Sequence, residues 1–264
     1  MNIPILFEDD AMLVINKPPG IVVNNAESVK GETIQNWVVD YLSFPRRRES
    51  ALSEGGSPIR SGMTEYDYKK EFEARAGIVH RIDKETSGIL LIAKTPEAFF
   101  ELQRQFKEHI IQKTYIAIAH GKLVPPEGEI NAPVGRLPWN REHFGIVPGG
   151  KESITKYRVL RIVPAAEPGP HGIPGQARND KEFSLIELYP QSGRTHQIRV
   201  HLKYINHPIL GDYLYAGRKT ARADRTWAKR VMLHAWKLTC LHPVTKKELA
   251  IEAPIPDDMR RIIE

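Results

Sequence analysis

The spacing of apolar residues along this chain predicts strands in several segments. Residues 12–23 (MLVINKPPGIVV) have two short apolar runs around Pro18-Pro19-Gly20, a pattern typical of two strands joined by a turn. Runs rich in β-branched and aromatic residues favour further strands. They lie at residues 112–121 (QKTYIAIAHG), 153–163 (SITKYRVLRIV) and 182–190 (EFSLIELYP), and on both sides of His242-Pro243 within residues 226–254.

Two other segments have helical patterns. Residues 95–110 begin with Thr95 as a candidate N-cap, Pro96 at the first helical position and Glu97 in the first turn. The apolar residues that follow at helical spacing are Phe99, Leu102 and Phe106. Residues 257–264 (DDMRRIIE) predict a short closing helix.

Two stretches lack usable apolar periodicity. Residues 43–75 are rich in Arg, Ser, Gly and mixed charge, and residues 164–181 are rich in Pro and Gly. Such segments cannot bury enough apolar surface to offset the entropy of ordering them. We therefore expect both to be flexible surface insertions within a single catalytic domain that spans residues 1–264.

The amino-acid composition predicts a sizeable buried core and a net positive charge. Of 264 residues, 41% are hydrophobic and 27% are charged, which excludes global disorder. Lys and Arg total 38 against 32 Asp and Glu, giving a net charge of +6. A positive balance suits a polyanionic partner because cationic side chains displace counterions from phosphates, although many basic proteins bind no nucleic acid.

The cysteine count and the N-terminus indicate a compartment. Cys240 is the only cysteine, so no intramolecular disulfide can form and a reducing environment is favoured. The first residues, MNIPILFEDD, are acidic where a signal peptide needs positive charge, and no later run approaches the length of a membrane span. We expect a cytoplasmic protein without membrane association.

The segment GIVHRIDKETSGILLIAK, residues 77–94, places several ionisable groups between two apolar runs. If residues 78–82 form a strand, alternation puts Arg81 and Asp83 on the same face at its end. The small polar residues before Gly88 then allow a tight return, which leaves Asp83 free to face a cleft. The alternative is an ordinary surface Arg–Asp pair beside a turn, which contributes little stability.

A second polar segment, LYPQSGRTHQIRVHLKYINHPILGD, covers residues 188–212. We expect a helix from about Thr195 with Arg194 at its N-terminus and with an apolar stripe. Its other face carries His196, Arg199 and Lys203, which with the helix N-terminal amides can bind an anion. A solvated helix face is the alternative. No metal-binding spacing of His or Cys occurs, so no metal site is expected.

Five segments together resemble the motifs of the A-type (large-ribosomal-subunit) pseudouridine synthases. In chain order they are VINKPPGIVV, GIVHRIDKETSGILLIAKT, QKTYIAIAHG, LYPQSGRTHQIRVHL and HPILGD. The resemblance covers nearly the whole chain outside the two insertions. It implies an α+β fold with a mixed, mainly antiparallel central sheet flanked by helices, and a substrate cleft across that sheet.

The resemblance also implies roles for individual residues. Asp83 takes the position of the essential aspartate, Arg194 that of an arginine paired with it, and Tyr115 that of a tyrosine against the base. Arg81 takes the position of an arginine that replaces the flipped-out uridine. The residues expected to bind substrate are Arg81, His80, Lys84, Thr195, His196, Gln197 and Arg199, with an apolar wall at Ile209 or Leu210.

The sequence departs from the family pattern in two places. After KPPGIVV the family commonly has His-Pro, whereas this chain has Asn24-Asn25. The family often carries an N-terminal RNA-binding domain of the ribosomal S4 type, but here the catalytic motifs start almost at Met1. RNA selection is therefore expected to depend on the core itself or on a partner.

The expected reaction is the isomerisation of specific uridines to pseudouridine in structured RNA, with ribosomal RNA preferred over transfer RNA, by a monomer without a cofactor. Asp83 can act by covalent attack or by promoting elimination from the ribose, and Tyr115 is a candidate for removing the C5 proton. Two alternatives remain open. A glycosidic-bond hydrolase would need a second carboxylate, for which Glu85 is a weak candidate, and a non-catalytic RNA-binding module would not need Asp83.

Overall fold

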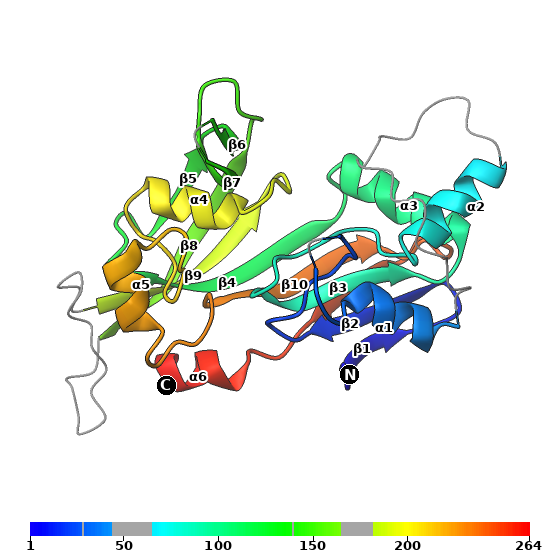
Figure 1. Ribbon diagram of the computed structural model, residues 1–264, viewed down its shortest axis with the longest axis horizontal. Coiled ribbons are helices and arrows are strands. Elements are labelled where there is room, and N and C mark those ends of the chain that lie inside the picture. The colour runs from blue at the N-terminus through cyan, green and yellow to red at the C-terminus, as the bar shows by residue number, and fades with distance from the viewer. Residues whose placement is uncertain (28, 44–64, 139, 165–181) are drawn as a thin grey trace.

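A long twisted sheet forms the body of the molecule (Figure 1). The computed structural model describes residues 1–27, 29–43, 65–138, 140–164 and 182–264. In spatial order the strands are β1 (Ile5–Glu8), β2 (Met12–Lys17), β3 (Ser87–Ala93), β10 (Leu233–Leu241), β4 (Gln112–His120), β9 (Glu182–Pro190), β8 (Ile154–Pro164) and β5 (Glu127–Asn131), with β11 (Glu248–Glu252) paired to β10. A separate hairpin consists of β6 (Val134–Leu137) and β7 (Asn140–Ile146).

The strands pair antiparallel throughout the described sheet except where β3 meets β10 in parallel. That parallel contact joins only Ser87 to His234 and Gly88 to Ala235. The expected mixed, mainly antiparallel sheet flanked by helices is therefore confirmed. The predicted strands at 112–121, 153–163 and 182–190 correspond to β4, β8 and β9.

Six helices flank the sheet in the described part of the chain (Figure 1). They are α1 (Ile34–Tyr41), α2 (Glu65–Ala74), α3 (Pro96–Lys107), α4 (Gln197–Tyr204), α5 (Arg218–Asp224) and α6 (Asp257–Ile263). Helices α2 and α3 pack beside each other at one end of the molecule, and α4 packs near β7, β8 and β9 at the other end. Nowhere in the described ranges is a helix both long and apolar enough to span a bilayer.

The helix α3 begins where the sequence predicts. The Thr95 hydroxyl accepts a hydrogen bond from the Ala98 amide at 3.2 Å, Pro96 occupies the first turn, and Glu97 lies near the positive end of the helix dipole. The predicted apolar face is buried at Phe99 and Leu102. Local capping and amphipathic packing therefore act together here.

Strand β3 is buried on both faces, which explains its continuous apolar run. Ile89 and Leu91 pack in the cluster beneath α3, whereas Leu90 and Ile92 pack in the cluster beneath α1. Because every residue of β3 is buried, the strand is a rigid base for the polar loop that precedes it.

The predicted strand at residues 78–82 is wrong. Ile78 forms only an isolated bridge with Ile92, and the next residues leave the sheet. The reason is a change of hydrogen-bond partner, since the Leu91 amide donates to His80 Nε2 at 3.0 Å instead of to a backbone carbonyl. The ladder thus ends early and releases the segment that carries Asp83.

The second predicted strand of residues 12–23 is also wrong. Residues after Gly20 form no strand, because the carbonyls of Val22 and Val23 accept hydrogen bonds from Ile34 and Gln35 at the start of α1. The backbone groups that a strand would need therefore cap a helix.

The C-terminal boundary predicted for the insertion at residues 43–75 lies too far along the chain, because a helix begins at residue 65. Residues 65–74 form α2, and Phe72 is 5% exposed and packs edge-on against Phe99, with their ring centroids 5.8 Å apart. The buried ring of Phe72 packs this otherwise polar helix against the core. Residues 44–64 and 165–181 lie outside the described residues.

Replacing Phe72 with alanine should lower the free energy of unfolding by about 3–4 kcal/mol, because the truncation leaves a cavity beneath α2. Urea unfolding followed by circular dichroism measures the change. Lys70→Ala, at an exposed position of the same helix, is the matched control and should have little effect. Equal stability of Phe72→Ala and the wild type would show that α2 is not part of the core.

Candidate active site

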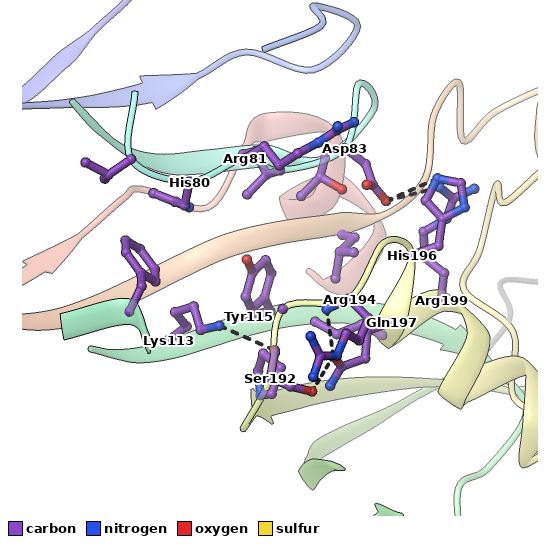
Figure 2. A pocket seen from close by; sticks show the side chains of 18 of the residues that line it. His80, Arg81, Asp83, Lys113, Tyr115, Ser192, Arg194, His196, Gln197 and Arg199 are labelled. Atoms are coloured by element: carbon purple, nitrogen blue, oxygen red, sulfur yellow. Dashed lines mark hydrogen bonds and ion pairs between the residues drawn. The ribbon is translucent and has the colours of Figure 1, made fainter. Parts of the chain in front are cut away.

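A cavity of about 320 Å³ opens across the middle of the sheet. Asp83 reaches it from the loop before β3, Tyr115 from β4, and His196 and Arg199 from the segment that begins α4 (Figure 2). Segments more than a hundred residues apart therefore meet here, which the sequence motifs alone cannot show.

Backbone hydrogen bonds fix the loop that carries Asp83. The Lys84 carbonyl accepts from the Gly20 amide at 2.7 Å and from Lys17 Nζ at 3.1 Å. The Thr86 amide donates to the Asp83 carbonyl at 3.1 Å, which closes a turn. The carboxylate thus extends from a loop with little backbone freedom.

Lys17 is fully buried and acts through its three N–H donors. Its Nζ donates to the carbonyls of Pro18 at 2.8 Å and Ile21 at 2.9 Å as well as to Lys84. Burial lowers the pKa of Lys17 to about 7. Three carbonyl acceptors satisfy all the donors of the ammonium group, so Lys17 connects the Pro18-Pro19-Gly20 turn to the Asp83 loop.

Gly88, near the start of β3, allows that strand to approach β10. A Cβ atom at this position would lie 2.2 Å from the Ala235 carbonyl oxygen, and the φ angle of Gly88 is +110°. The Ser87 hydroxyl also hydrogen-bonds His234 Nδ1 at 2.8 Å. The glycine in the predicted turn is therefore required by a close contact between strands.

Arg199 links two carboxylates. Its Nη1 donates to Asp83 Oδ2 at 3.1 Å, while Nε and Nη2 donate to the two oxygens of Asp212 at 2.8 and 2.9 Å. The bidentate pair fixes the plane of the guanidinium. Arg199 and Asp212 are buried, whereas the Asp83 side chain keeps 21% of its surface exposed, so only Asp83 is accessible to a substrate.

Further contacts hold this arrangement. Asp212 Oδ1 accepts from the amides of Leu214 and Tyr215 at 3.0 and 3.2 Å. The Arg199 guanidinium lies 5.0 Å from the Tyr215 ring centroid, a cation–π contact. The Tyr215 hydroxyl hydrogen-bonds His196 Nδ1 at 2.8 Å.

Burial and charge set the protonation of these groups. Burial opposes the charged form of Arg199, but the hydrogen bonds and charges of Asp212 and Asp83 more than offset it, so the pKa of Arg199 is raised. Burial lowers the pKa of His196 despite the nearby charge of Asp83. The site therefore pairs a permanent guanidinium with Asp83 and keeps His196 neutral near pH 7.

Tyr115 lines the cavity from β4, and its hydroxyl has no hydrogen bond to any residue that the structure describes. Burial, with a smaller contribution from the charge of Asp83, raises the pKa of Tyr115. The hydroxyl is therefore protonated at neutral pH. It is available to a ligand as a donor, and the ring offers a flat apolar surface.

The expected pairing of Arg194 with Asp83 is not what the structure shows. Arg194 is exposed and lies beside Gln197 and Ser192, with its amide donating to Gln197 Oε1 at 3.0 Å (Figure 2). Asp83 pairs with Arg199, because the chain turns at His196 and α4 begins only at Gln197. Arg194 still lines the same cavity.

The prediction that Ile209 or Leu210 forms the apolar wall of the site is also wrong. Both residues are fully buried in the core and do not line the cavity. Leu233 at the start of β10 and Ile198 in α4 line it instead. Leu233 was missed because its strand is sequence-distant from the other motifs, and only the sheet topology brings it to the site.

The remaining residues expected to bind substrate differ in their positions. His80 is on the cavity wall, with its ring centroid 4.7 Å from that of Phe106 and the two ring planes tilted by 35°. Burial lowers the pKa of His80 to about 3. Lys84 and Thr195 are exposed, and neither lines this cavity. Gln197 Oε1 accepts from Ser192 Oγ at 2.7 Å, and its Nε2 donates to the Ile154 carbonyl at 3.0 Å. Gln197 therefore orders the loop around Ser192.

A basic side chain that the sequence did not single out also lines the cavity. Lys113 in β4 donates to the Ser192 carbonyl at 3.4 Å (Figure 2), and burial lowers its pKa to about 8. Within the described ranges no group of three or more His, Cys, Asp or Glu residues could hold a metal ion.

Comparisons with known proteins identify the family. Residues 11–204 match the family described as RNA pseudouridylate synthase. The ribosomal large subunit pseudouridine synthase D of Nitrosomonas europaea is 36% identical, over 98% of this chain and 64% of that protein. The uncharacterized RNA pseudouridine synthase YlyB of Bacillus subtilis is 34% identical, over 100% of this chain and 73% of that protein. The chain belongs to the RNA pseudouridylate synthase family.

A comparison with solved structures finds the same kind of fold. The human RNA pseudouridylate synthase domain containing 1 aligns with a TM-score of 0.63 and 24% identity, over 96% of this chain and 83% of that chain. The chain spans 64% and 61% of the length of the large subunit pseudouridine synthases D of Nitrosomonas europaea and Neisseria meningitidis serogroup A.

Replacing Asp212 with asparagine should destabilise the protein by about 3 kcal/mol, because it leaves the buried Arg199 without its main counterion. Chemical denaturation measures the loss. Asp257→Asn breaks an exposed ion pair with Arg260 and should change stability little. If the two variants were equally stable, Asp212 would not be a structural partner of Arg199.

Proposed function

We propose that this protein is an RNA pseudouridine synthase that uses Asp83 to convert uridine to pseudouridine. The observation that carries the proposal is the partly exposed Asp83 carboxylate, held by the buried Arg199 at 3.1 Å, in a cavity that Tyr115 also lines. Family membership supplies the reaction class, and the site supplies the groups that such a reaction needs.

The reaction breaks the bond from uracil N1 to ribose C1′ and makes a bond from C5 to C1′, so no atoms are gained or lost. In one route Asp83 attacks C1′, uracil leaves as an anion and turns, and C5 then displaces the carboxylate. In the other route Asp83 takes the proton from ribose C2′ and uracil leaves as an anion. When C5 adds to C1′, Asp83 returns that proton to C2′. Both routes need a fixed carboxylate beside the sugar, and Arg199 orients the oxygen of Asp83 for this.

The free uracil must turn without leaving the site. We place its ring against Tyr115, with Leu233 and Ile198 as apolar neighbours. The protonated Tyr115 hydroxyl can donate a hydrogen bond to a uracil oxygen. To take the C5 proton, directly or through water, Tyr115 must pass its own proton to N1, the atom freed when the glycosidic bond breaks. C5 then loses one proton, N1 gains one, and the phenol is regenerated.

The target uridine must also leave its base stack to reach Asp83, which costs a few kcal/mol. Arg81 is exposed at the cavity edge next to Asp83. Its planar guanidinium can stack in the gap that the extruded base leaves. Phosphate contacts by cationic side chains around the cavity offset the remaining cost.

The substrate that we propose is ribosomal RNA of the large subunit. This follows the names of the relatives that match nearly the whole chain. We expect the protein to act in the cytoplasm, as a monomer and without a cofactor. A hydrolase is less consistent with the site, because Glu85 accepts hydrogen bonds from Arg225 at 3.0 and 2.6 Å and from the Val231 amide at 3.1 Å. That carboxylate is a structural group.

Replacing Asp83 with asparagine should abolish conversion while leaving the fold and RNA affinity nearly unchanged, since the amide has the same shape but cannot act as a nucleophile or base. Nucleoside analysis of a treated large-subunit RNA transcript and filter binding measure the two quantities. Asp10→Asn, in the β1–β2 turn, is the matched control and should convert normally. Conversion by Asp83→Asn at the wild-type rate would refute the assignment.

Replacing Tyr115 with phenylalanine should lower the single-turnover rate by about 100-fold and leave RNA affinity almost unchanged, because it removes the hydroxyl but keeps the ring. Tyr115→Ala removes both and should also weaken binding. Rapid-quench kinetics and filter binding separate these effects. A normal rate for Tyr115→Phe would mean that the ring alone matters.

A further inference from the structure

A second cavity, of about 490 Å³, adjoins the first. Both are lined by the same group of residues around Asp83, namely Arg81, Ile82, Asp83, His196 and Arg199. Tyr115 and Leu233 line only the first cavity, whereas Tyr213, Leu214 and Arg225 line only the second. Asp83 therefore lies where the two cavities meet.

An aromatic and an aliphatic side chain project at the second cavity. Tyr213 is 60% exposed and Leu214 is 37% exposed, although their neighbours Asp212 and Tyr215 are buried. The Asp212 carboxylate holds the local backbone through the amides of Leu214 and Tyr215. The side chains of Tyr213 and Leu214 are thus held on a fixed turn while much of their surface faces solvent. Exposed apolar side chains grouped in this way are typical of a binding surface.

Arg225, which also lines the second cavity, is fixed to the same turn. Arg225 donates to the Gly211 carbonyl at 2.7 Å and forms a bidentate pair with Glu85. This pair connects the Tyr213 turn to the loop that carries Asp83. The spacing between Tyr213 and Asp83 is therefore set before any ligand binds.

The charge around the second cavity suits a phosphodiester. The carboxylates that line it are occupied, since Asp83 pairs with Arg199 and Glu85 with Arg225. Arg81 and Lys84 line it as exposed cations, and the structure gives neither a carboxylate partner among the described residues. A cationic rim beside an exposed aromatic ring is the combination that binds single-stranded nucleic acid.

We infer that the second cavity is a subsite for the nucleotide that directly neighbours the target uridine, with its base stacked on Tyr213 and its phosphate held by Lys84. The inference rests on the proposed function, because it needs the target uridine in the first cavity. Adjacent nucleotides share one phosphate, so a strand with its uridine at Asp83 must place a neighbour close by. Tyr213 and Leu214 would then determine which RNA sequence or fold the enzyme accepts.

The test uses a stem-loop cut from a large-subunit RNA transcript around the uridine that the wild-type protein converts. Two further stem-loops have no base at the nucleotide immediately 5′ or immediately 3′ of that uridine. Tyr213→Ala should bind the intact stem-loop about tenfold more weakly than the wild type, as expected for one lost base–aromatic stack.

Two variants serve as controls. Tyr213→Phe keeps the ring and should bind within about twofold of the wild type. Tyr204→Ala removes a similarly exposed tyrosine, 57% exposed at the end of α4, that lines neither cavity. It should bind and convert the RNA normally.

The abasic stem-loops identify the position. On one of them, the wild type and Tyr213→Ala should bind equally, because the base that Tyr213 contacts is gone. Unchanged affinity of Tyr213→Ala for the intact stem-loop, or equal weakening on both abasic stem-loops, would overturn the subsite while leaving conversion by the wild type, and hence the proposed function, intact. If the wild type converted no uridine at all, the proposed function would fail first and the subsite would fall with it.

Discussion

The buried guanidinium of Arg199 is the interaction on which the site depends. It bridges Asp212, which is fully buried, and Asp83, which is partly exposed. A buried arginine without a carboxylate would be strongly unfavourable, so Asp212 and the turn that follows it must form for the protein to fold around this group. The stability of the core and the position of the Asp83 carboxylate are therefore coupled.

This coupling extends to the loops on either side. Lys17 and Gly20 hold the Asp83 loop from the N-terminal side through the Lys84 carbonyl, and Arg225 holds it from the other side through Glu85. The carboxylate is thus fixed from three directions, although it lies in a loop. The reaction proposed above, which breaks and remakes bonds at one sugar carbon, would benefit from such preorganisation, since little reordering is needed when substrate binds.

The sequence predicted the fold better than it predicted the contacts of the site. Segments with one clear period, such as α3 with its Thr95 cap and strands β4, β8 and β9, agree with the structure because local hydrogen bonding and burial favour the same state. The strand predicted at residues 78–82 failed because a side chain, His80, replaced a backbone acceptor. Periodicity contains no information about such an exchange.

The partner of Asp83 could not be read from the sequence for a related reason. Arg194 and Arg199 are five residues apart, and which of them faces Asp83 depends on the left-handed conformation of His196, whose φ is +57°. Asp212 ends the motif HPILGD, but nothing in that motif marks it as the partner of Arg199. Leu233 lies in none of the five motifs and reaches the site only through the pairing of β10 in the sheet. Motif spacing identified the right segments, and tertiary structure selected the residues within them.

The most direct test of this account is a crystal structure with RNA in which the target uridine carries fluorine at C5, a substituent that blocks loss of the C5 proton. The account predicts the base in the first cavity against Tyr115, its ribose in contact with the Asp83 carboxylate, and Arg199 still bound to both Asp83 and Asp212. A ribose bound far from Asp83, or Asp83 released from Arg199 in the complex, would contradict it.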